Sequence, residues 1–166
     1  VSAVYMSQVL PFLKGDEIER GIKKVFNWLI AGGEVFVVTF TPFIQHVTSF
    51  IPVYNERKRN GQRWAGYIDD LAQFSSHENI YKHLPNEIHH IDLEDLKWVF
   101  EINGFVIKEV RYFGEEEGAL PEGIKMDGRE RVGLIASRPL GSQTQEYTDW
   151  QRVSDNLLER VPPSIR

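Results

Sequence analysis

Two apolar runs on either side of one amphipathic segment constrain the fold of this chain more than any other feature. The residues from Val1 to Met6 are apolar at neighbouring positions, and residues 34–40 are rich in β-branched and aromatic side chains. A strand that is apolar on both faces is typical of a parallel sheet covered by helices on both sides. We therefore predict a right-handed strand–helix–strand unit. Its helix spans residues 16–29 and repeats apolar side chains at helical spacing: Ile18, Ile22, Val25, Phe26 and Leu29.

Both ends of the predicted helix carry local signals. Asp16 is the expected N-cap, and Glu19, three residues later, completes a capping box. Gly32 and Gly33 follow the last apolar position, where a left-handed residue and a turn commonly end a helix. The second strand is therefore expected to begin directly at Glu34.

Beyond this unit the regular pattern stops and then resumes. Residues 41–91 contain three prolines, a polar stretch and many large aromatic side chains, a composition that predicts an inserted lid and not disorder. Asp92 is the predicted N-cap of a helix that ends at Gly104, and two strands are expected over residues 105–113 and 132–137. The predicted organisation has four segments: a strand–helix–strand unit (1–40), a lid (41–91), a helix with two final strands (92–140), and a linker with a C-terminal helix (141–166).

Composition limits the function classes. The absence of cysteine excludes a disulfide framework, an iron–sulfur site and a thiol nucleophile. A net charge of −5, with basic residues clustered only at 57–59, argues against nucleic acid or a membrane surface as partner. No apolar run reaches the roughly 18 to 20 residues of a membrane helix. We expect a cytoplasmic location and a small-molecule partner. Because the chain begins inside a strand, we expect it to be a fragment of a longer protein.

The order of these features resembles the second half of a known family. The ending Gln8-Val9-Leu10-Pro11-Phe12-Leu13, the helix of residues 16–29 and the strand after Gly32-Gly33 resemble the fourth strand, following helix and fifth strand of class I S-adenosylmethionine-dependent methyltransferases. The helix from Asp92 and the two later strands resemble the late helix, sixth strand and antiparallel seventh strand. The resemblance implies an α/β fold: the C-terminal half of a Rossmann-like three-layer αβα sheet, last strand antiparallel, with an inserted lid.

The chain also departs from the family pattern. The family holds its cofactor with a Gly-x-Gly-x-Gly turn after its first strand and an acidic residue ending its second, and neither is in this sequence. Ser2 and Pro11 stand where the family often has Asp and His. An acid or histidine that relatives use at those places is therefore not available to this chain.

The resemblance implies which strand ends face the ligands. In an open α/β sheet, ligands bind at the carboxyl ends of the strands. This rule places the cofactor S-adenosylmethionine near Met6, Ser7, Gln8 and Leu10, and the acceptor near Thr41. The alternative is that Ser7 and Gln8 only turn the chain toward the helix.

The lid supplies the remaining candidate residues. Phe43, Tyr54, Trp64 and Tyr67, together with Thr41, are candidates to line an acceptor pocket, and an equally good alternative is a local core that lets the lid fold. His89 or His90 is a candidate base toward an acceptor hydroxyl. Because neighbouring side chains in an extended segment point to opposite faces, these two histidines are not expected to share a metal ion.

The sequence therefore predicts methyl transfer from S-adenosylmethionine to a small-molecule acceptor, by an enzyme of which this chain is the C-terminal part and alone inactive. The alternative is a non-catalytic binding or assembly module derived from the same fold. We also expect self-association through the edge formed from Val1 to Met6, because an uncovered apolar strand pairs readily with another chain.

Overall fold

The structure is a computed structural model, and it describes residues 1–76, 82–114 and 123–141. A four-stranded sheet runs through it in the order β1-β2-β6-β5. Strands β1 (Ala3–Ser7) and β2 (Glu34–Phe40) are parallel, and β6 (Arg131–Ser137) runs antiparallel to both β2 and β5 (Val106–Phe113). The predicted α/β sheet with an antiparallel last strand is confirmed.

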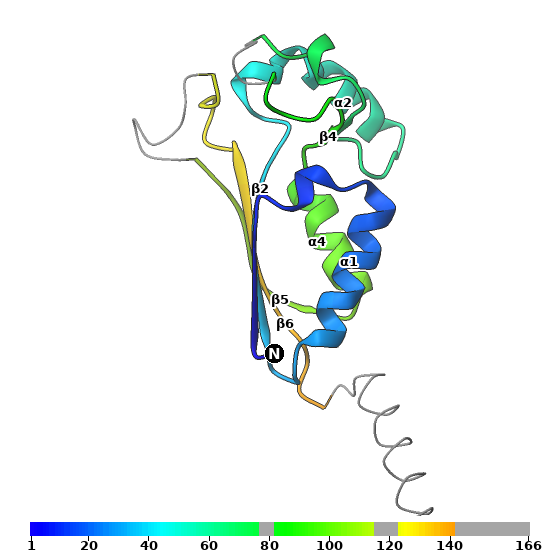
Figure 1. The fold of residues 1–166 in the computed structure, drawn as a ribbon, viewed down its shortest axis with the longest axis vertical. Coiled ribbons are helices and arrows are strands. Elements are labelled where there is room, and N and C mark those ends of the chain that lie inside the picture. The colour runs from blue at the N-terminus through cyan, green and yellow to red at the C-terminus, as the bar shows by residue number, and fades with distance from the viewer. Residues whose placement is uncertain (77–81, 115–122, 142–166) are drawn as a thin grey trace, which may run out of the picture.

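Two helices pack on the same face of this sheet. Helices α1 (Gly15–Trp28) and α4 (Leu93–Ile102) lie side by side there (Figure 1). Side chains on β2 and β6 alternate strictly between buried and half-buried, because successive residues of a strand point to opposite faces. The buried set forms the main core with the two helices: Val35, Val37, Val132, Leu134 and Ala136 from the strands, and Ile18, Ile22, Val25, Leu96, Val99 and Phe100 from the helices.

The opposite face of the sheet, here called the open face, carries no helix within the described residues (Figure 1). Tyr5 of β1 points to this face and is 69% exposed. Within the described residues, α1 and α4 cover one face of the sheet, and the other face of β1 has no helix on it (Figure 1).

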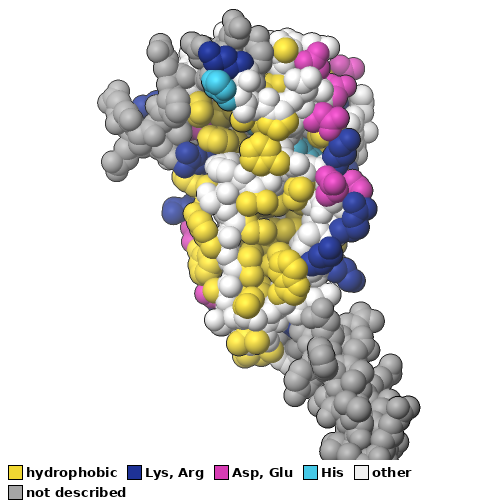
Figure 2. Space-filling model, viewed as in Figure 1, with side chains coloured by type: hydrophobic (Ala, Val, Ile, Leu, Met, Phe, Trp, Pro, Cys, Tyr) yellow, Lys and Arg dark blue, Asp and Glu magenta, His cyan; other side chains and the backbone are white. Residues whose placement is uncertain are grey.

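Exposed apolar side chains continue from β1 toward α1. Figure 2 shows them as a band of hydrophobic surface along the β1 edge of the sheet, with charged side chains beside it on the side of α1. We call this band the apolar stripe, and its residues are all 47% or more exposed: Val1, Tyr5, Val9, Phe12, Trp28 and Ile30.

The start of α1 differs from the prediction. The N-cap is Lys14, and its backbone N–H donates to Glu17 Oε2 at 2.8 Å, so Glu17 takes the capping role expected of Glu19. Asp16 instead forms an ion pair with Arg20, 2.8 Å apart, one turn later. Glu19 accepts a hydrogen bond from the Trp64 indole, a long-range contact that no local pattern announces.

The end of α1 is as expected. The helix stops at Trp28, and Gly32 follows with a φ of 78°, a conformation that glycine adopts without strain. A Cβ at Gly33 would lie 3.0 Å from the Ser2 carbonyl oxygen. The turn can therefore pass this close to β1 because residue 33 has no side chain.

The lid segment, residues 41–91, lies at the end of the sheet where β1 and β2 finish (Figure 1). Its described part contains 3₁₀ turns at Gln45–Phe50 and Leu71–Gln73, helix α2 (Ile51–Arg59), and a two-stranded antiparallel sheet of β3 (Tyr67–Ile68) and β4 (Ile88–His89). A short 3₁₀ turn, Leu10–Phe12, connects β1 to α1 beneath it. The lid has a separate core, formed mainly by Ile44, Val47, Phe50, Ile68 and Leu71.

The predicted C-terminal helix falls in residues 142–166, outside the described part of the chain. Among the helices that the structure describes, none combines the length and apolar character needed to span a membrane.

Candidate functional site

A partly open cavity of about 200 Å³ lies between the carboxyl ends of β1 and β2 and the lid. Its walls come from four separate stretches of sequence: the turn after β1, the stretch from the end of β2 into the lid, the return from the lid through β4, and the segment before β6. Most of the lining side chains are apolar: Pro11, Phe12, Phe40, Ile44, Leu84, Ile88 and Ile124. The polar ones are Gln8, His46 and His90.

Gln8 enters this cavity because its backbone is left-handed. Its φ is 55°, which is unusual for a residue other than glycine, and its N–H donates to the Val38 carbonyl at 2.9 Å. Neither the amide nitrogen nor the amide oxygen of its side chain, both buried, has a hydrogen-bond partner among the described residues. A polar residue with a buried side-chain amide therefore lines the cavity at the end of β1.

His90 presents a second unsatisfied group to the same cavity. The residue is 2% exposed, and neither ring nitrogen has a hydrogen-bond partner among the described residues. Burial, with smaller contributions from the neighbouring His46 and His89, lowers the pKa of the His90 imidazole to about 3. The ring is therefore neutral near pH 7, with one nitrogen as a donor and the other as an acceptor.

The backbone fixes where His90 lies. Its N–H donates to the Gly66 carbonyl at 3.0 Å, and a Cβ on Gly66 would come within 1.8 Å of the His90 carbonyl oxygen. Only glycine at position 66 allows the backbone segments around residues 66 and 90 to pass this closely. The ring of His46 stands edge-on to His90, with 6.5 Å between ring centroids, and its Nδ1 lies 3.3 Å from the Ser75 hydroxyl.

The lining residues of the cavity indicate which kind of ligand it can bind. A buried polar group without a partner destabilises a protein by about 1 to 3 kcal/mol, so unsatisfied groups facing one cavity favour a ligand that satisfies them. The lining residues that the structure describes include no Lys, Arg, Asp or Glu. The cavity is thus suited to a small, uncharged ligand with a polar group.

Among the four predicted cofactor residues, only Gln8 lines the cavity. Leu10 is 2% exposed and belongs to the main core, and Met6 packs against that core from β1. Ser7 is exposed at the end of β1. The strand end therefore divides its side chains among the core, the solvent and the cavity.

The lid residues Thr41, Phe43 and Tyr54 do not line the cavity. Thr41 is buried in a turn in which its hydroxyl donates to the Arg129 carbonyl and accepts from the Phe43 N–H. Phe43 packs edge-on against Tyr54, whose hydroxyl donates to Asp92 at 2.6 Å. This arrangement corresponds to the alternative considered from the sequence, a local core that holds the lid together.

Trp64 and Tyr67 lie on the other side of the turn after β1, where they line a shallow depression beside the start of α1. His89 lies between them, with ring centroids 5.2 Å and 5.6 Å from those of Trp64 and Tyr67. Its Nδ1 lies 3.1 Å from the Leu13 carbonyl, which can only accept, so Nδ1 carries the proton. Burial lowers the pKa of His89 to about 4.

The two neighbouring histidines thus face different hollows, as their extended backbone predicted. Within the described residues, no group of three or more His, Cys, Asp or Glu side chains is arranged to hold a metal ion. Of the pair, His90 is the one that faces the cavity at the strand ends.

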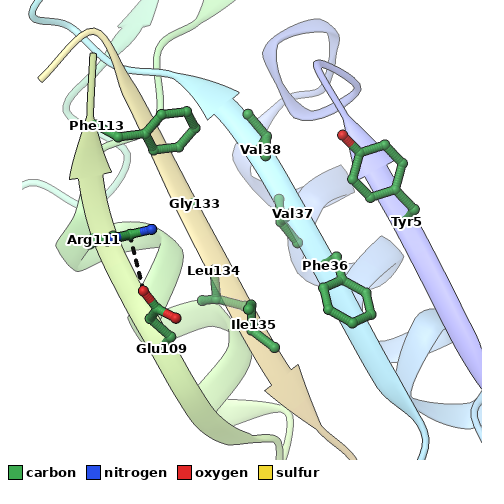
Figure 3. Close-up of a pocket in the computed structure, with 10 residues that line it drawn as sticks. All are labelled: Tyr5, Phe36, Val37, Val38, Glu109, Arg111, Phe113, Gly133, Leu134 and Ile135. Carbon is green, nitrogen blue, oxygen red and sulfur yellow. Dashed lines mark ion pairs between the residues drawn. The ribbon is translucent and has the colours of Figure 1, made fainter. Parts of the chain in front are cut away.

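A second hollow lies on the open face of the sheet. Figure 3 shows this groove, of about 230 Å³, between the Tyr5 and Phe36 rings on one side and Phe113 on the other. Among the described residues that line it, the charged side chains are Glu109 and Arg111, which pair with each other at 3.0 Å. None of these lining residues has a buried polar side-chain atom without a partner, so the groove lacks this feature of the cavity at the strand ends.

Comparison with solved structures identifies the fold. An S-adenosylmethionine-dependent methyltransferase from Methanosarcina mazei is similar with a TM-score of 0.55 and 18% identity, over 84% of this chain and 59% of that protein. Another from Mesorhizobium loti is similar with a TM-score of 0.50 and 17% identity, over 82% of this chain and 61% of that protein. No protein-family model and no curated protein matches the sequence.

The chain therefore has the fold of class I S-adenosylmethionine-dependent methyltransferases, as the sequence predicted. It spans about three fifths of the length of these two solved structures. The cavity lies at the carboxyl ends of parallel strands, the edge of an open α/β sheet where ligands bind.

Proposed function

We propose that this chain is the acceptor-binding, C-terminal part of an enzyme that transfers a methyl group from S-adenosylmethionine to a small molecule. One observation carries the proposal: the unsatisfied side chains of Gln8 and His90 face the same cavity, at the strand ends of a methyltransferase sheet. The acceptor binds in this cavity, and its polar group is held by these two residues.

The residues present fit one side of the cofactor. Ser7 is exposed at the end of β1, next to the left-handed backbone of Gln8, and is therefore available to the cofactor from the side of this strand. The sequence has no Gly-x-Gly-x-Gly turn, so these 166 residues do not supply the glycine-rich part of a cofactor cradle. When bound, the cofactor supplies a methyl group that its sulfonium has already activated.

Each residue at the cavity then has a defined task. The neutral His90 ring accepts a hydrogen bond from the acceptor's O–H or N–H and orients its lone pair. Gln8, at the strand end, holds the same polar group from the side of β1. The apolar walls exclude water, so that positioning and desolvation supply most of the rate enhancement, as suits a reaction with an activated leaving group.

Calorimetry on two forms of the protein tests this proposal. The product of the complete reading frame is expected to bind S-adenosylhomocysteine at low micromolar concentration, and the 166-residue chain alone is expected to bind it far more weakly. Absence of binding by the complete product would contradict the proposal and favour a non-catalytic binding module, the alternative that the missing glycine turn suggests.

A further inference from the structure

We infer that the cavity at the strand ends binds an uncharged aromatic ring that carries a hydroxyl or amino group, with this group hydrogen-bonded by His90 and Gln8. The inference names the acceptor class and so rests on the proposed function, but the binding it describes does not need the cofactor. It follows from the size, the walls and the polar groups of the cavity.

The size of the cavity matches one ring. Its volume is about 200 Å³. A protein cavity of roughly 150 Å³ with an apolar lining is known to hold benzene. A ring with one polar substituent fits this larger space.

The walls favour a flat apolar body. Phe40 closes the cavity from the end of β2, and Ile44, Ile88 and Ile124 surround it from the lid and from the segment before β6. Aromatic and branched side chains of this kind stabilise a ring by dispersion and by removal of its apolar surface from water.

The polar groups require a ligand without charge. A charge buried in an apolar cavity is strongly unfavourable unless an opposite charge accompanies it, and among the described residues no acidic or basic side chain other than histidine lines this cavity. The Arg131 guanidinium lies over the Phe40 ring, 5.1 Å from its centroid, but Arg131 is not a lining residue. Carboxylated and cationic rings are therefore excluded.

A hydroxyl or amino group on the ligand complements the hydrogen-bonding groups of His90 and Gln8. Neutral His90 offers one donor and one acceptor nitrogen, and the Gln8 amide offers two donor hydrogens and an acceptor oxygen. A phenolic hydroxyl can donate to one of these residues and accept from the other. A hydrocarbon ring leaves both unsatisfied, so the site is expected to discriminate strongly between the two.

Ligand-observed NMR titration with four single-ring probes, phenol, toluene, benzoate and benzylamine, tests the inference without cofactor. We expect phenol to bind about tenfold more tightly than toluene, a difference of about 1.4 kcal/mol, and the two charged probes to bind more weakly than either. Equal affinity for phenol and toluene, tighter binding of a charged probe, or no binding of phenol would overturn the inference.

One variant and a matched control test whether Gln8 is responsible for the preference for phenol over toluene. Gln8→Leu is expected to reduce the phenol affinity to that of toluene while leaving toluene binding unchanged. Gln73→Leu replaces an exposed glutamine on the lid and serves as the matched control, which should keep the wild-type preference. A preference for phenol that survives in Gln8→Leu contradicts the role of this residue.

A further measurement stays informative if the Gln8 variant unfolds. Addition of phenol to the wild-type protein should shift the ¹⁵N resonances of the His90 ring but leave those of His89 unchanged, because His89 faces another hollow. A shift confined to His89 would overturn the inference. Phenol binding without any binding of S-adenosylhomocysteine by the complete product would retain this inference and remove the proposed function.

Discussion

Burial of His90 makes the stability of the fold depend on pH. Its folded-state pKa of about 3 lies below the usual value of 6.5, so between these two values the unfolded chain binds more protons. Stability from the neutral ring is therefore complete above pH 6.5 and is lost as the pH falls toward 3. The titratable groups packed against this ring are His46 and His89, and burial lowers the pKa of His89 in the same direction.

We expect urea denaturation to detect this loss. Between pH 7 and pH 5, His90 alone should account for about 2 kcal/mol of the decrease in unfolding free energy. His90→Phe should flatten the pH profile by that amount, whatever its effect at pH 7. Parallel profiles for the wild type and this variant would show that His90 is not buried in a neutral form.

Asp92 connects two parts of the fold, helix α2 and the start of α4, through one buried carboxylate. It is 2% exposed, accepts from the Tyr54 hydroxyl at 2.6 Å, pairs with Lys58 at 3.0 Å and caps α4 by accepting from the Asp95 N–H at 2.7 Å. The lid helix α2, which carries Tyr54 and Lys58, is thereby fastened to the start of α4.

Two substitutions separate these contacts. Tyr54→Phe should lower the unfolding free energy by about 1 to 2 kcal/mol, because a buried carboxylate loses one charge-assisted hydrogen bond. Asp92→Ala should lower it further, because it also removes the cap and leaves Lys58 without this carboxylate partner. Thermal and urea denaturation measure both. A Tyr54→Phe variant as stable as the wild type would contradict the inferred strength of this contact.

At the scale of secondary-structure elements, Trp64 joins the lid to α1. Its φ of 58° places the indole against the start of the helix, where its Nε1–H donates to Glu19 at 3.0 Å and its ring packs edge-on against His89 and Trp98. A Cβ on Gly15 would lie 2.2 Å from this indole, so α1 accepts Trp64 only because residue 15 is glycine.

Trp64→Ala is therefore expected to act on stability and not on ligand choice. The lost contacts should lower the unfolding free energy by about 3 kcal/mol, near the lower end for large aromatic truncations because the side chain is half-buried. At a temperature where the variant is folded, its preference for phenol over toluene should equal that of the wild type. A selective loss of phenol binding would instead assign Trp64 to the ligand site.

The elements of the sheet were predictable because their patterns are local. The period-two alternation of β2 and β6 follows from one buried face, and the helical spacing of Ile18, Ile22 and Val25 follows from the other side of the same core. The N-cap of α1 was not predictable. Glu17 accepts a hydrogen bond from the backbone N–H of Lys14, and lysine is not among the residues that usually form an N-cap. The exact start of a helix can depend on a single hydrogen bond, and the spacing of apolar residues does not reveal that bond.

The cavity was predictable only in part. Gln8 was expected at the strand end, but Phe40, His46 and Ile124 come from segments that no sequence spacing relates to one another. These residues come together because of how the lid backbone folds, including the close contact between Gly66 and the His90 backbone. Sequence spacing likewise gives no sign that Arg138 is almost fully buried and donates to the Leu29 carbonyl, at 2.8 Å, at the end of α1.

At the scale of the whole molecule, the described chain is a sheet with one face covered by helices and two edge strands, β1 and β5, of which β1 borders the apolar stripe. β1 pairs with β2 alone, so the other side of this strand presents free backbone donors and acceptors. The apolar stripe runs along the same edge (Figure 2), and the groove of Figure 3 extends the apolar surface onto the open face. Exposed apolar surface that is contiguous in this way usually marks an interaction site.

We propose that a second copy of this chain covers the edge, through antiparallel pairing of two β1 strands about a twofold axis. Such pairing satisfies the free backbone groups of both strands and buries Tyr5 and the adjoining stripe of each copy at once. Light scattering on the 166-residue chain at tens of micromolar should therefore report a dimer. Tyr5→Lys, which places a charge on the bare edge, should shift the chain toward the monomer, because edge lysines oppose strand pairing. Ile102→Glu, at another exposed apolar position, on α4 (54%, against 69% for Tyr5), is the control and should leave the dimer intact. A wild-type chain that stays monomeric at this concentration would show that the stripe does not bind a second copy.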